Sequence, residues 1–139
     1  TGEVFSLLSK QSVLKHNMDY DSWDSDIFQS SVGDSISQPA VFSSALFSMR
    51  AQSLVSKGAN KFAQNFSRLS GLLIGMELVA SRPYWLGQNV AVIGDTKIAN
   101  AYFEALKGQG TSLMMADAER MTLEGLKSAY NSLEKEVAR

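Results

Sequence analysis

Gly94 and Asp95 form the turn in this chain that could best carry chemistry. They follow a short apolar run, residues 89–93, and precede a helical pattern. Ligands of α/β proteins bind at the carboxyl ends of parallel strands, so this turn is the predicted ligand edge. Asp95 places a carboxylate where a phosphate would bind at a helix N-terminus, which favours a sugar or base contact over a pyrophosphate contact. The same turn also fits an ordinary connection between a strand and a helix.

Arg50 is the arginine whose position most needs an explanation. It falls between Phe47 and Leu54 on one face of a predicted helix. A buried guanidinium without a partner is costly, so Arg50 requires an anion. The partner is either a carboxylate of a neighbouring helix or an acidic substrate.

Gly71 and Gly75 stand four residues apart in the longest predicted helix, residues 59–82. Each glycine costs about 1 kcal/mol relative to alanine inside a helix. Close approach of another group to this face would offset that cost. Either a packed helix or sheet, or a bound ligand, fits the pattern.

Other catalytic patterns are missing from the sequence. It has no cysteine and no GxGxxG, P-loop, HExxH or GxSxG motif. The acidic stretch 18–25 lacks the glycine and glutamate of a calcium-binding EF-hand loop, so we interpret it as a polar turn. His16, the only histidine, lies at a predicted helix end and is interpreted as a capping or surface residue.

The elements that position these residues are mostly helices. Length, 139 residues, and a hydrophobic content of 45% fit one domain with a real core. Periodicity predicts helices over residues 1–14, 25–36, 40–57, 59–82, 96–107 and 119–137. Two parallel, adjacent strands are predicted over residues 89–93 and 112–116. The prediction is a helix-dominated α/β chain, with a helical portion over residues 1–88 and a β-α-β-α portion over residues 89–139.

Net charge and hydropathy limit the classes of partner that the sequence gives reason to expect. The net charge of −1 gives no reason to expect nucleic acid or a membrane surface as a partner. No apolar run reaches the roughly 18 residues of a membrane span. The lack of cysteine agrees with a cytoplasmic location, which we expect.

Several segments, in order along the chain, resemble the 2-dehydro-3-deoxygalactonokinase (2-keto-3-deoxygalactonate kinase) family. They are TGEVFSLLSKQSVLKH at residues 1–16, FSMRA at 47–51, LSGLLIGMEL at 69–78, VIG at 92–94 with the helix that follows, and ADAE at 116–119. The resemblance covers only the C-terminal half of that family's sequence.

The resemblance implies a sugar-acid kinase with an actin/hexokinase-like (RNase-H-like) ATPase fold. Such an enzyme would transfer the γ-phosphoryl group of ATP, with Mg²⁺, to the 6-hydroxyl of 2-dehydro-3-deoxy-D-galactonate in galactonate catabolism. Gly71, Gly75, Gly94 and Asp95 would then border the nucleotide. Arg50 would bind the substrate carboxylate, because arginine recognises carboxylates with two hydrogen bonds. Glu3 would accept hydrogen bonds from substrate hydroxyls, or otherwise only stabilise the dipole of the first helix.

The family pattern also includes an N-terminal domain and strands with a phosphate segment, which this chain lacks. We therefore expect a fragment of a kinase that is inactive alone, with the catalytic base outside residues 1–139 and the missing N-terminal domain as a partner. A two-stranded parallel sheet leaves open edges, which predicts self-association or an exposed edge. The alternative is a free-standing helical interaction module without catalytic activity.

Overall fold

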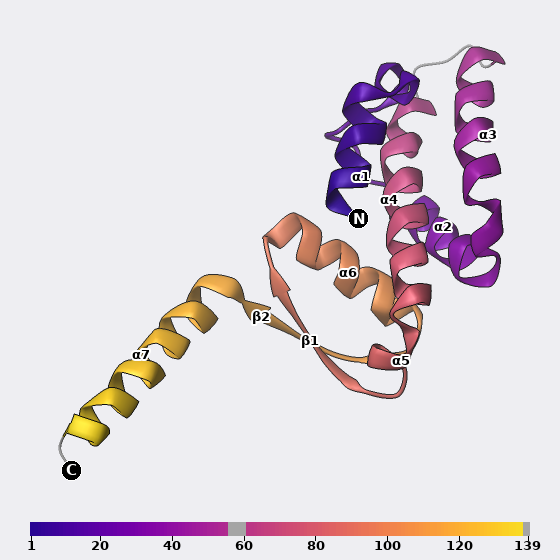
Figure 1. Ribbon diagram of the computed structural model, residues 1–139. Coiled ribbons are helices and arrows are strands. Elements are labelled where there is room, and N and C mark those ends of the chain that lie inside the picture. Colours follow the sequence, from indigo (N-terminus) through magenta and orange to yellow (C-terminus); the bar gives the residue numbers. More distant parts are fainter. Residues whose placement is uncertain (56–60, 138–139) are drawn as a thin grey trace. The chain divides into compact units, whose positions relative to one another are not determined.

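The computed structural model describes residues 1–55 and 61–137. They belong to two compact units, Thr1–Leu86 and Gly87–Arg139. The boundary lies within two residues of the predicted division between a helical portion and a β-α-β-α portion. Helices dominate, and the two strands form a small parallel sheet (Figure 1). The helix-dominated α/β prediction is confirmed.

The first unit is built around α4, Lys61–Ala80. Helix α2, Ser25–Ser37, packs along it, and α3, Phe42–Val55, contacts it as well (Figure 1). All residues from 69 to 75 are buried, which agrees with the nearly continuous apolar character of this stretch. The main core cluster joins α4 to α3 and to the N-terminal segment through Leu14, Met49, Leu69, Leu72 and Leu73.

The N-terminal segment departs from the single helix predicted over residues 1–14. It consists of α1, Gly2–Ser6, then a π-helical turn, Leu7–Gln11, and a 3₁₀ turn, Val13–Asn17. Ser12 interrupts the helix, because its amide bonds to the Leu7 carbonyl at 3.1 Å and its hydroxyl oxygen accepts from the Leu14 amide at 3.1 Å. Local competition from a serine side chain thus replaces the regular helical ladder.

The acidic stretch forms a polar turn that leads into α2, as the turn interpretation predicts. Asp24 caps α2 by accepting a hydrogen bond from the Ile27 amide at 3.0 Å, and its own amide donates to the Ser67 hydroxyl at 2.8 Å. Asp19 accepts from the hydroxyl of Ser22 at 2.6 Å. These carboxylates are therefore used in local turn and cap contacts.

The helix boundaries follow the sequence signals. A 3₁₀ turn, Pro39–Val41, separates α2 from α3, at the division between the helices predicted over residues 25–36 and 40–57. The predicted end of α3 at 57 and start of α4 at 59 lie outside the described residues. A short helix, α5 (Arg82–Trp85), ends the unit, and the buried Trp85 donates its indole N–H to the Leu78 carbonyl at 2.8 Å.

The second unit contains the strands β1, Asn89–Gly94, and β2, Ser112–Asp117, each extending one residue beyond its prediction. Their parallel register runs from Asn89 opposite Ser112 to Gly94 opposite Asp117. Helix α6, Thr96–Gly108, connects them and contacts both strands, and α7, Ala118–Val137, follows β2. Alanines and Leu106 of α6 supply the buried side of this unit.

Candidate functional site

The carboxyl edge of the β1–β2 sheet brings together Gly94 and Asp95, which the sequence predicts as a ligand edge, and Asp117. Gly94 and Asp117 end the two strands opposite each other, and Asp95 follows Gly94 directly. Asp95 caps α6 by accepting from the Lys97 amide at 3.1 Å, and Asp117 accepts from the Arg120 amide at 2.7 Å at the start of α7. The edge therefore presents one glycine and two capping carboxylates.

Asp117 is a member of this edge that the motif analysis did not single out. The sequence signal that could have identified Asp117 is the second strand-to-helix unit. Because the two strands are parallel, their register places Asp117 opposite Gly94.

Gly94 leaves space for a ligand at this edge. A Cβ atom on Gly94 would have only the Ala99 Cβ near it among the described residues, at 3.9 Å, and Gly94 is exposed. The carboxylates of Asp95 and Asp117 occupy the helix N-terminal positions that favour phosphate. A phosphate at this edge would therefore meet two carboxylates instead of free helix N-termini.

A metal site is not formed by the part of the chain that the structure describes. Within these residues, no group of three or more His, Asp or Glu side chains is placed to hold an ion.

Gly71 and Gly75 do not border an open space, and their predicted nucleotide role is not supported. A Cβ atom on Gly71 would collide with the Phe28 carbonyl oxygen of α2. A Cβ atom on Gly75 would lie 2.7 Å from the Ser35 Cβ and 2.8 Å from the Val32 carbonyl oxygen. Helix α2 fills the face where a ligand was one of the two alternatives, so helix packing explains both glycines.

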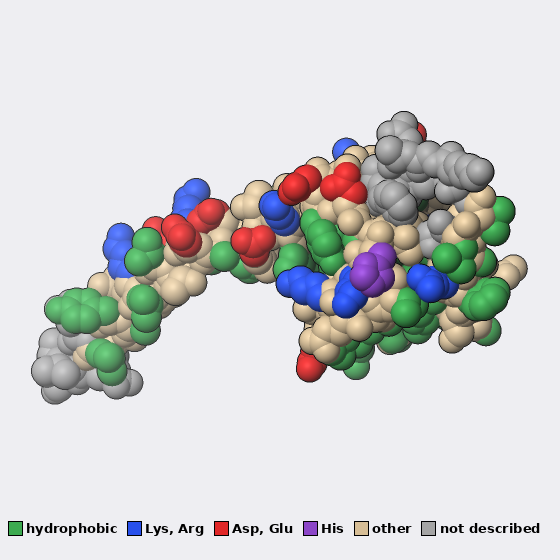
Figure 2. Space-filling view, turned by 90° about the horizontal axis from the view of Figure 1, so that it is seen from above, with side chains coloured by type: hydrophobic (Ala, Val, Ile, Leu, Met, Phe, Trp, Pro, Cys, Tyr) green, Lys and Arg blue, Asp and Glu red, His purple; other side chains and the backbone are tan. Residues whose placement is uncertain are grey.

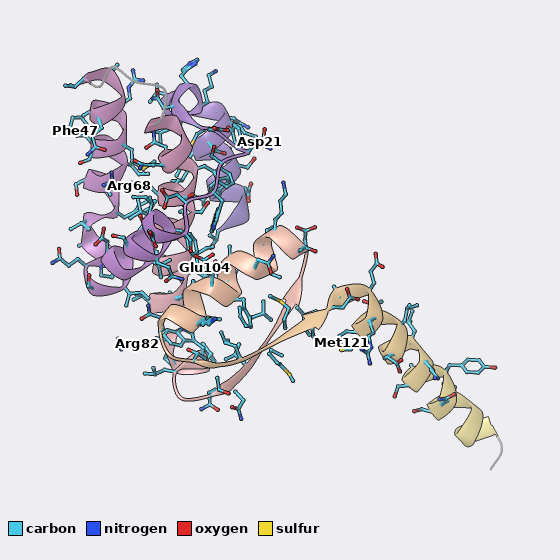
Figure 3. The ribbon with its side chains drawn as sticks, turned by 180° about the vertical axis from the view of Figure 1, so that it is seen from behind. Asp21, Phe47, Arg68, Arg82, Glu104 and Met121 are labelled. Carbon is cyan, nitrogen blue, oxygen red and sulfur yellow. The ribbon has the colours of Figure 1, made fainter. Side chains whose placement is uncertain are left out.

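Arg50 lies in α3, but the helix face that it was predicted to share with Phe47 and Leu54 is not buried. Its apolar neighbours Phe47 and Leu54 are 73% and 70% exposed, and Figure 3 shows Phe47 at the outer side of α3. Helix α3 buries Met49 instead. Arg50 is half-buried and is not without an interaction partner. The face that carries Phe47 and Leu54 is therefore not a buried one, and the choice between a carboxylate of the chain and an acidic substrate as the partner of Arg50 stays a prediction.

Glu3 lies in the first turn of α1 and is exposed. Its position fits stabilisation of the helix dipole, and it also leaves the carboxylate accessible to a ligand. His16 is exposed near the end of the 3₁₀ turn, where Figure 2 shows it on the surface with basic side chains around it. This placement confirms the interpretation of His16 as a surface residue.

Among the helices of the described chain, none combines the length and apolar character that crossing a bilayer requires.

The chain is similar to known proteins over nearly its whole length. The model of the family described as 2-keto-3-deoxy-galactonokinase matches residues 1–129. A solved structure from Sinorhizobium meliloti, assigned by name to the 2-dehydro-3-deoxygalactonokinases, is similar with a TM-score of 0.81 and 27% sequence identity. The similarity covers 95% of this chain and 44% of that one, so this chain spans less than half of the neighbour's length. No curated protein matches the chain.

Proposed function

We propose a function from family membership: this chain belongs to the 2-keto-3-deoxy-galactonokinase family, and it acts as the C-terminal part of a sugar-acid kinase. The whole enzyme would transfer the γ-phosphoryl group of ATP to the 6-hydroxyl of 2-dehydro-3-deoxy-D-galactonate. The family match over residues 1–129 is the observation that carries this proposal. The solved neighbour supports it through a shared arrangement of nearly the whole chain.

The nucleotide would meet this chain at the carboxyl edge of the sheet. The open space beside Gly94 allows close approach of an adenosine moiety, and the Asp95 carboxylate can accept hydrogen bonds from ribose hydroxyls. The phosphates and Mg²⁺ would be held mainly by residues outside this chain, because the carboxylates of Asp95 and Asp117 already occupy the helix N-termini at this edge. This division of labour fits an actin/hexokinase-like fold, in which two domains close on the nucleotide.

The sugar acid would contact the first unit. Arg50 would bind its carboxylate and Glu3 would accept hydrogen bonds from its hydroxyls. The half-burial of Arg50 favours a fixed guanidinium, and the exposure of Glu3 leaves its carboxylate accessible. The proposed reaction belongs to galactonate catabolism in the cytoplasm, with which a cysteine-free chain agrees.

The second unit exposes many apolar side chains, as expected of a part of a larger enzyme. Ile93 and Met114 on the sheet are 55% and 63% exposed, and one stripe of α7 exposes Leu123, Leu126, Tyr130 and Leu133. Parallel sheets are normally covered on both faces. We propose that the additional part of the longer kinase covers these side chains, and that the strand edge promotes self-association when that part is absent.

The test is a kinase assay that measures ADP release from ATP and 2-dehydro-3-deoxy-D-galactonate. The full-length kinase in which this segment occurs should be active, and residues 1–139 alone should not, because phosphoryl transfer depends on groups that position the phosphates and metal. A full-length protein that releases ADP equally with neutral sugars would overturn the proposed substrate. Activity of residues 1–139 alone would overturn the division of labour.

A further inference from the structure

The outer side of α3 is an apolar surface that no other part of the described chain covers. Phe47, Leu54 and Val55 are 73%, 70% and 83% exposed, whereas Met49, on the opposite side of the helix, is fully buried (Figure 3). Single exposed apolar side chains are ordinary, but several on one helix face indicate an interaction surface. We call this surface the α3 outer face, and it comprises Ser44, Phe47, Ala51, Leu54 and Val55.

The α3 outer face carries almost no charge. A helix face exposed to water normally carries charged side chains. Arg50 is the only charged residue of α3. At about 100° per residue, it lies about 60° from Phe47, at the border of the face. The face therefore has the composition of a protein contact and not that of a solvated surface.

The shape of the α3 outer face is complementary to itself. Phe47 and Leu54 lie within about 20° of each other around the helix and form a row of large side chains. Ser44 and Ala51 are equally close in angle and form a row of small side chains, about 60° to one side. A two-fold axis parallel to α3 lays the large row of each copy along the small row of the other. It also places Arg50 of the two copies on opposite sides of the contact. Such a self-complementary patch is what a symmetric dimer requires.

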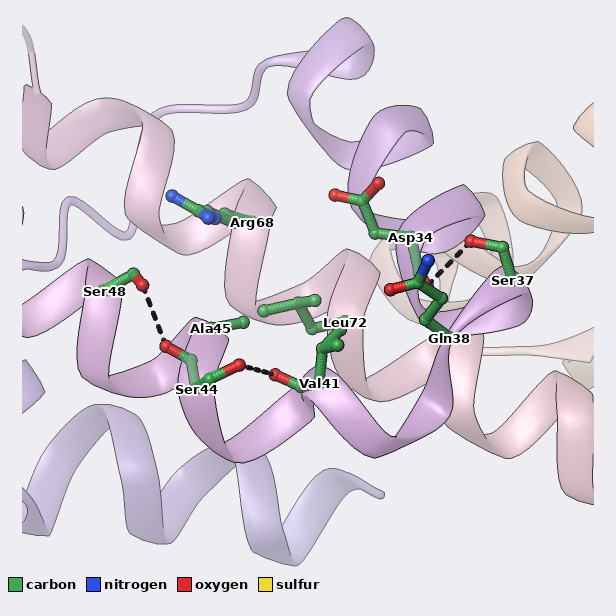
Figure 4. A pocket seen from close by; sticks show the side chains of 9 residues that line it. All are labelled: Asp34, Ser37, Gln38, Val41, Ser44, Ala45, Ser48, Arg68 and Leu72. Atoms are coloured by element: carbon green, nitrogen blue, oxygen red, sulfur yellow. Dashed lines mark hydrogen bonds between the residues drawn. The ribbon is translucent and has the colours of Figure 1, made fainter.

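The serines at this face can be covered without the loss of a hydrogen bond. The hydroxyl of Ser44 donates to the Val41 carbonyl at 2.8 Å, and that of its neighbour Ser48 donates to the Ser44 carbonyl at 2.9 Å (Figure 4). A hydroxyl hydrogen that is already donated within the helix leaves no unpaired donor when an apolar side chain covers it. The small row is therefore polar in composition but suited to an apolar partner.

A polar groove borders the α3 outer face. This Arg68 groove lies where α2, α3 and α4 meet, has a volume of about 320 Å³, and includes Ser44 and Ser48 in its lining (Figure 4). Its lining also includes the cation Arg68 and the anion Asp34, so neither an anion nor a cation is favoured throughout. Protein interfaces combine an apolar core with a polar, solvent-accessible rim. The groove has the character of such a rim beside the row of Phe47 and Leu54.

We propose that two copies of this protein associate through the α3 outer face, with their α3 helices parallel and related by a two-fold axis. Helix α3 has 14 residues and is about 21 Å long, so the contact is smaller than the about 800 Å² per partner of a standard interface. A reversible dimer with a Kd of roughly 10–100 µM is expected. This contact is separate from the sheet edge, and it persists when the rest of the kinase covers the sheet.

The first test is sedimentation equilibrium of the full-length kinase across this concentration range. Phe47→Glu should weaken the dimer at least tenfold, because it brings a carboxylate into an apolar contact. Tyr84→Glu is the matched control, since Tyr84 of α5 is 83% exposed and lies outside the α3 outer face. A dimer that Phe47→Glu leaves unchanged would overturn the proposal. A monomer at all concentrations would also overturn it and would assign the face to another part of the longer kinase.

The second test uses single cysteines in residues 1–139, which contain none. Equivalent positions of a parallel pair lie at the same level, so Leu54→Cys should form a disulfide-linked dimer under mild oxidation. An antiparallel pair centred on Met49 would hold the two Leu54 positions about 15 Å apart, too far for a disulfide. Tyr84→Cys should stay monomeric. Equal cross-linking of both variants, or none for Leu54→Cys, would overturn the parallel arrangement.

Discussion

Gly75 of α4 lies directly against Ser35 of α2, with room for a hydrogen but not for a methyl group. A Cβ atom built on Gly75 would stand 2.7 Å from the Ser35 Cβ. One turn earlier, Gly71 lies against the backbone of Phe28 in the same way. The Ser35 hydroxyl also donates to the Leu72 carbonyl at 2.9 Å, so the two helices are joined by a buried hydrogen bond at this approach.

This contact predicts that Gly71→Ala and Gly75→Ala destabilise the first unit. Overpacking costs about 1–3 kcal/mol and outweighs the gain of about 1 kcal/mol in helix propensity. Urea unfolding followed by tryptophan fluorescence reports this unit, because both tryptophans, Trp23 and Trp85, belong to it. We expect a net loss of up to about 2 kcal/mol for each substitution.

Gly33→Ala is the matched control for this prediction. Gly33 is a helical glycine of α2, and among the described residues no atom from outside its own stretch of helix lies within 4 Å of a built Cβ. Its substitution should stabilise the unit by about 0.5–1 kcal/mol. If Gly75→Ala instead matches Gly33→Ala in sign and size, the helices do not approach as closely as described.

How far the sequence predicts this fold depends on the range of the forces involved. The β-α-β-α portion was predicted to within one residue at each strand, because capping aspartates and periodicity act locally. The glycines of α4 indicated a close approach, but only the tertiary fold identifies α2 as the neighbour. The exposure of Phe47 was not predictable, since apolar periodicity does not show which of two faces has a partner.

The candidate site shows the same division. Gly94 and Asp95 were found from a local strand-to-helix signal, whereas Asp117 joins them only through the register of the sheet. The Arg68 groove combines residues from three helices that no local spacing connects. Ser12 was missed for a different reason: its side chain competes with the backbone ladder, which periodicity does not detect.

Ser9 provides a second stability prediction. Its side chain is fully buried in the π-helical turn, and its hydroxyl has no hydrogen-bond partner among the described residues. An unsatisfied buried hydroxyl costs free energy, so Ser9→Ala should leave stability unchanged or raise it by up to about 1 kcal/mol. Ser35→Ala, which removes a buried hydrogen bond, should instead lower the free energy of unfolding by about 1 kcal/mol. Equal losses for both variants would show that Ser9 has a partner, such as a buried water.

The pKa of the Asp19 carboxyl should lie below its ordinary value of 3.8. The hydrogen bond from the Ser22 hydroxyl lowers the pKa of Asp19, and the amide of Asp21 adds to the effect. Because ionised Asp19 is favoured in the folded state, its contribution is complete above the ordinary pKa and is lost as the pH falls through the lowered one. NMR titration of the carboxyl carbon checks this, and Ser22→Ala should move the pKa of Asp19 back towards 3.8. A pKa that does not respond to Ser22→Ala would contradict the assignment.

Gly94→Val tests the proposed nucleotide edge in the full-length kinase. The valine side chain would fill the open space beside Gly94, and the backbone there does not have a positive φ, so folding should be preserved. The apparent KM for ATP should rise about tenfold, equivalent to about 1.4 kcal/mol, with the KM for the sugar acid nearly unchanged. Equal changes in both constants, at an unchanged Tm, would remove Gly94 from the nucleotide site.

Arg50→Lys tests the proposed contact with the substrate carboxylate. Lysine keeps the charge but cannot form the two parallel hydrogen bonds of arginine. In the full-length kinase, sugar-acid binding should weaken at least tenfold, about 1.4 kcal/mol, while ATP binding changes little. Isothermal titration with each ligand separates these effects. If the variant loses thermal stability while its affinity for the sugar acid holds, Arg50 serves the fold through its partner within the chain, and the carboxylate is bound elsewhere.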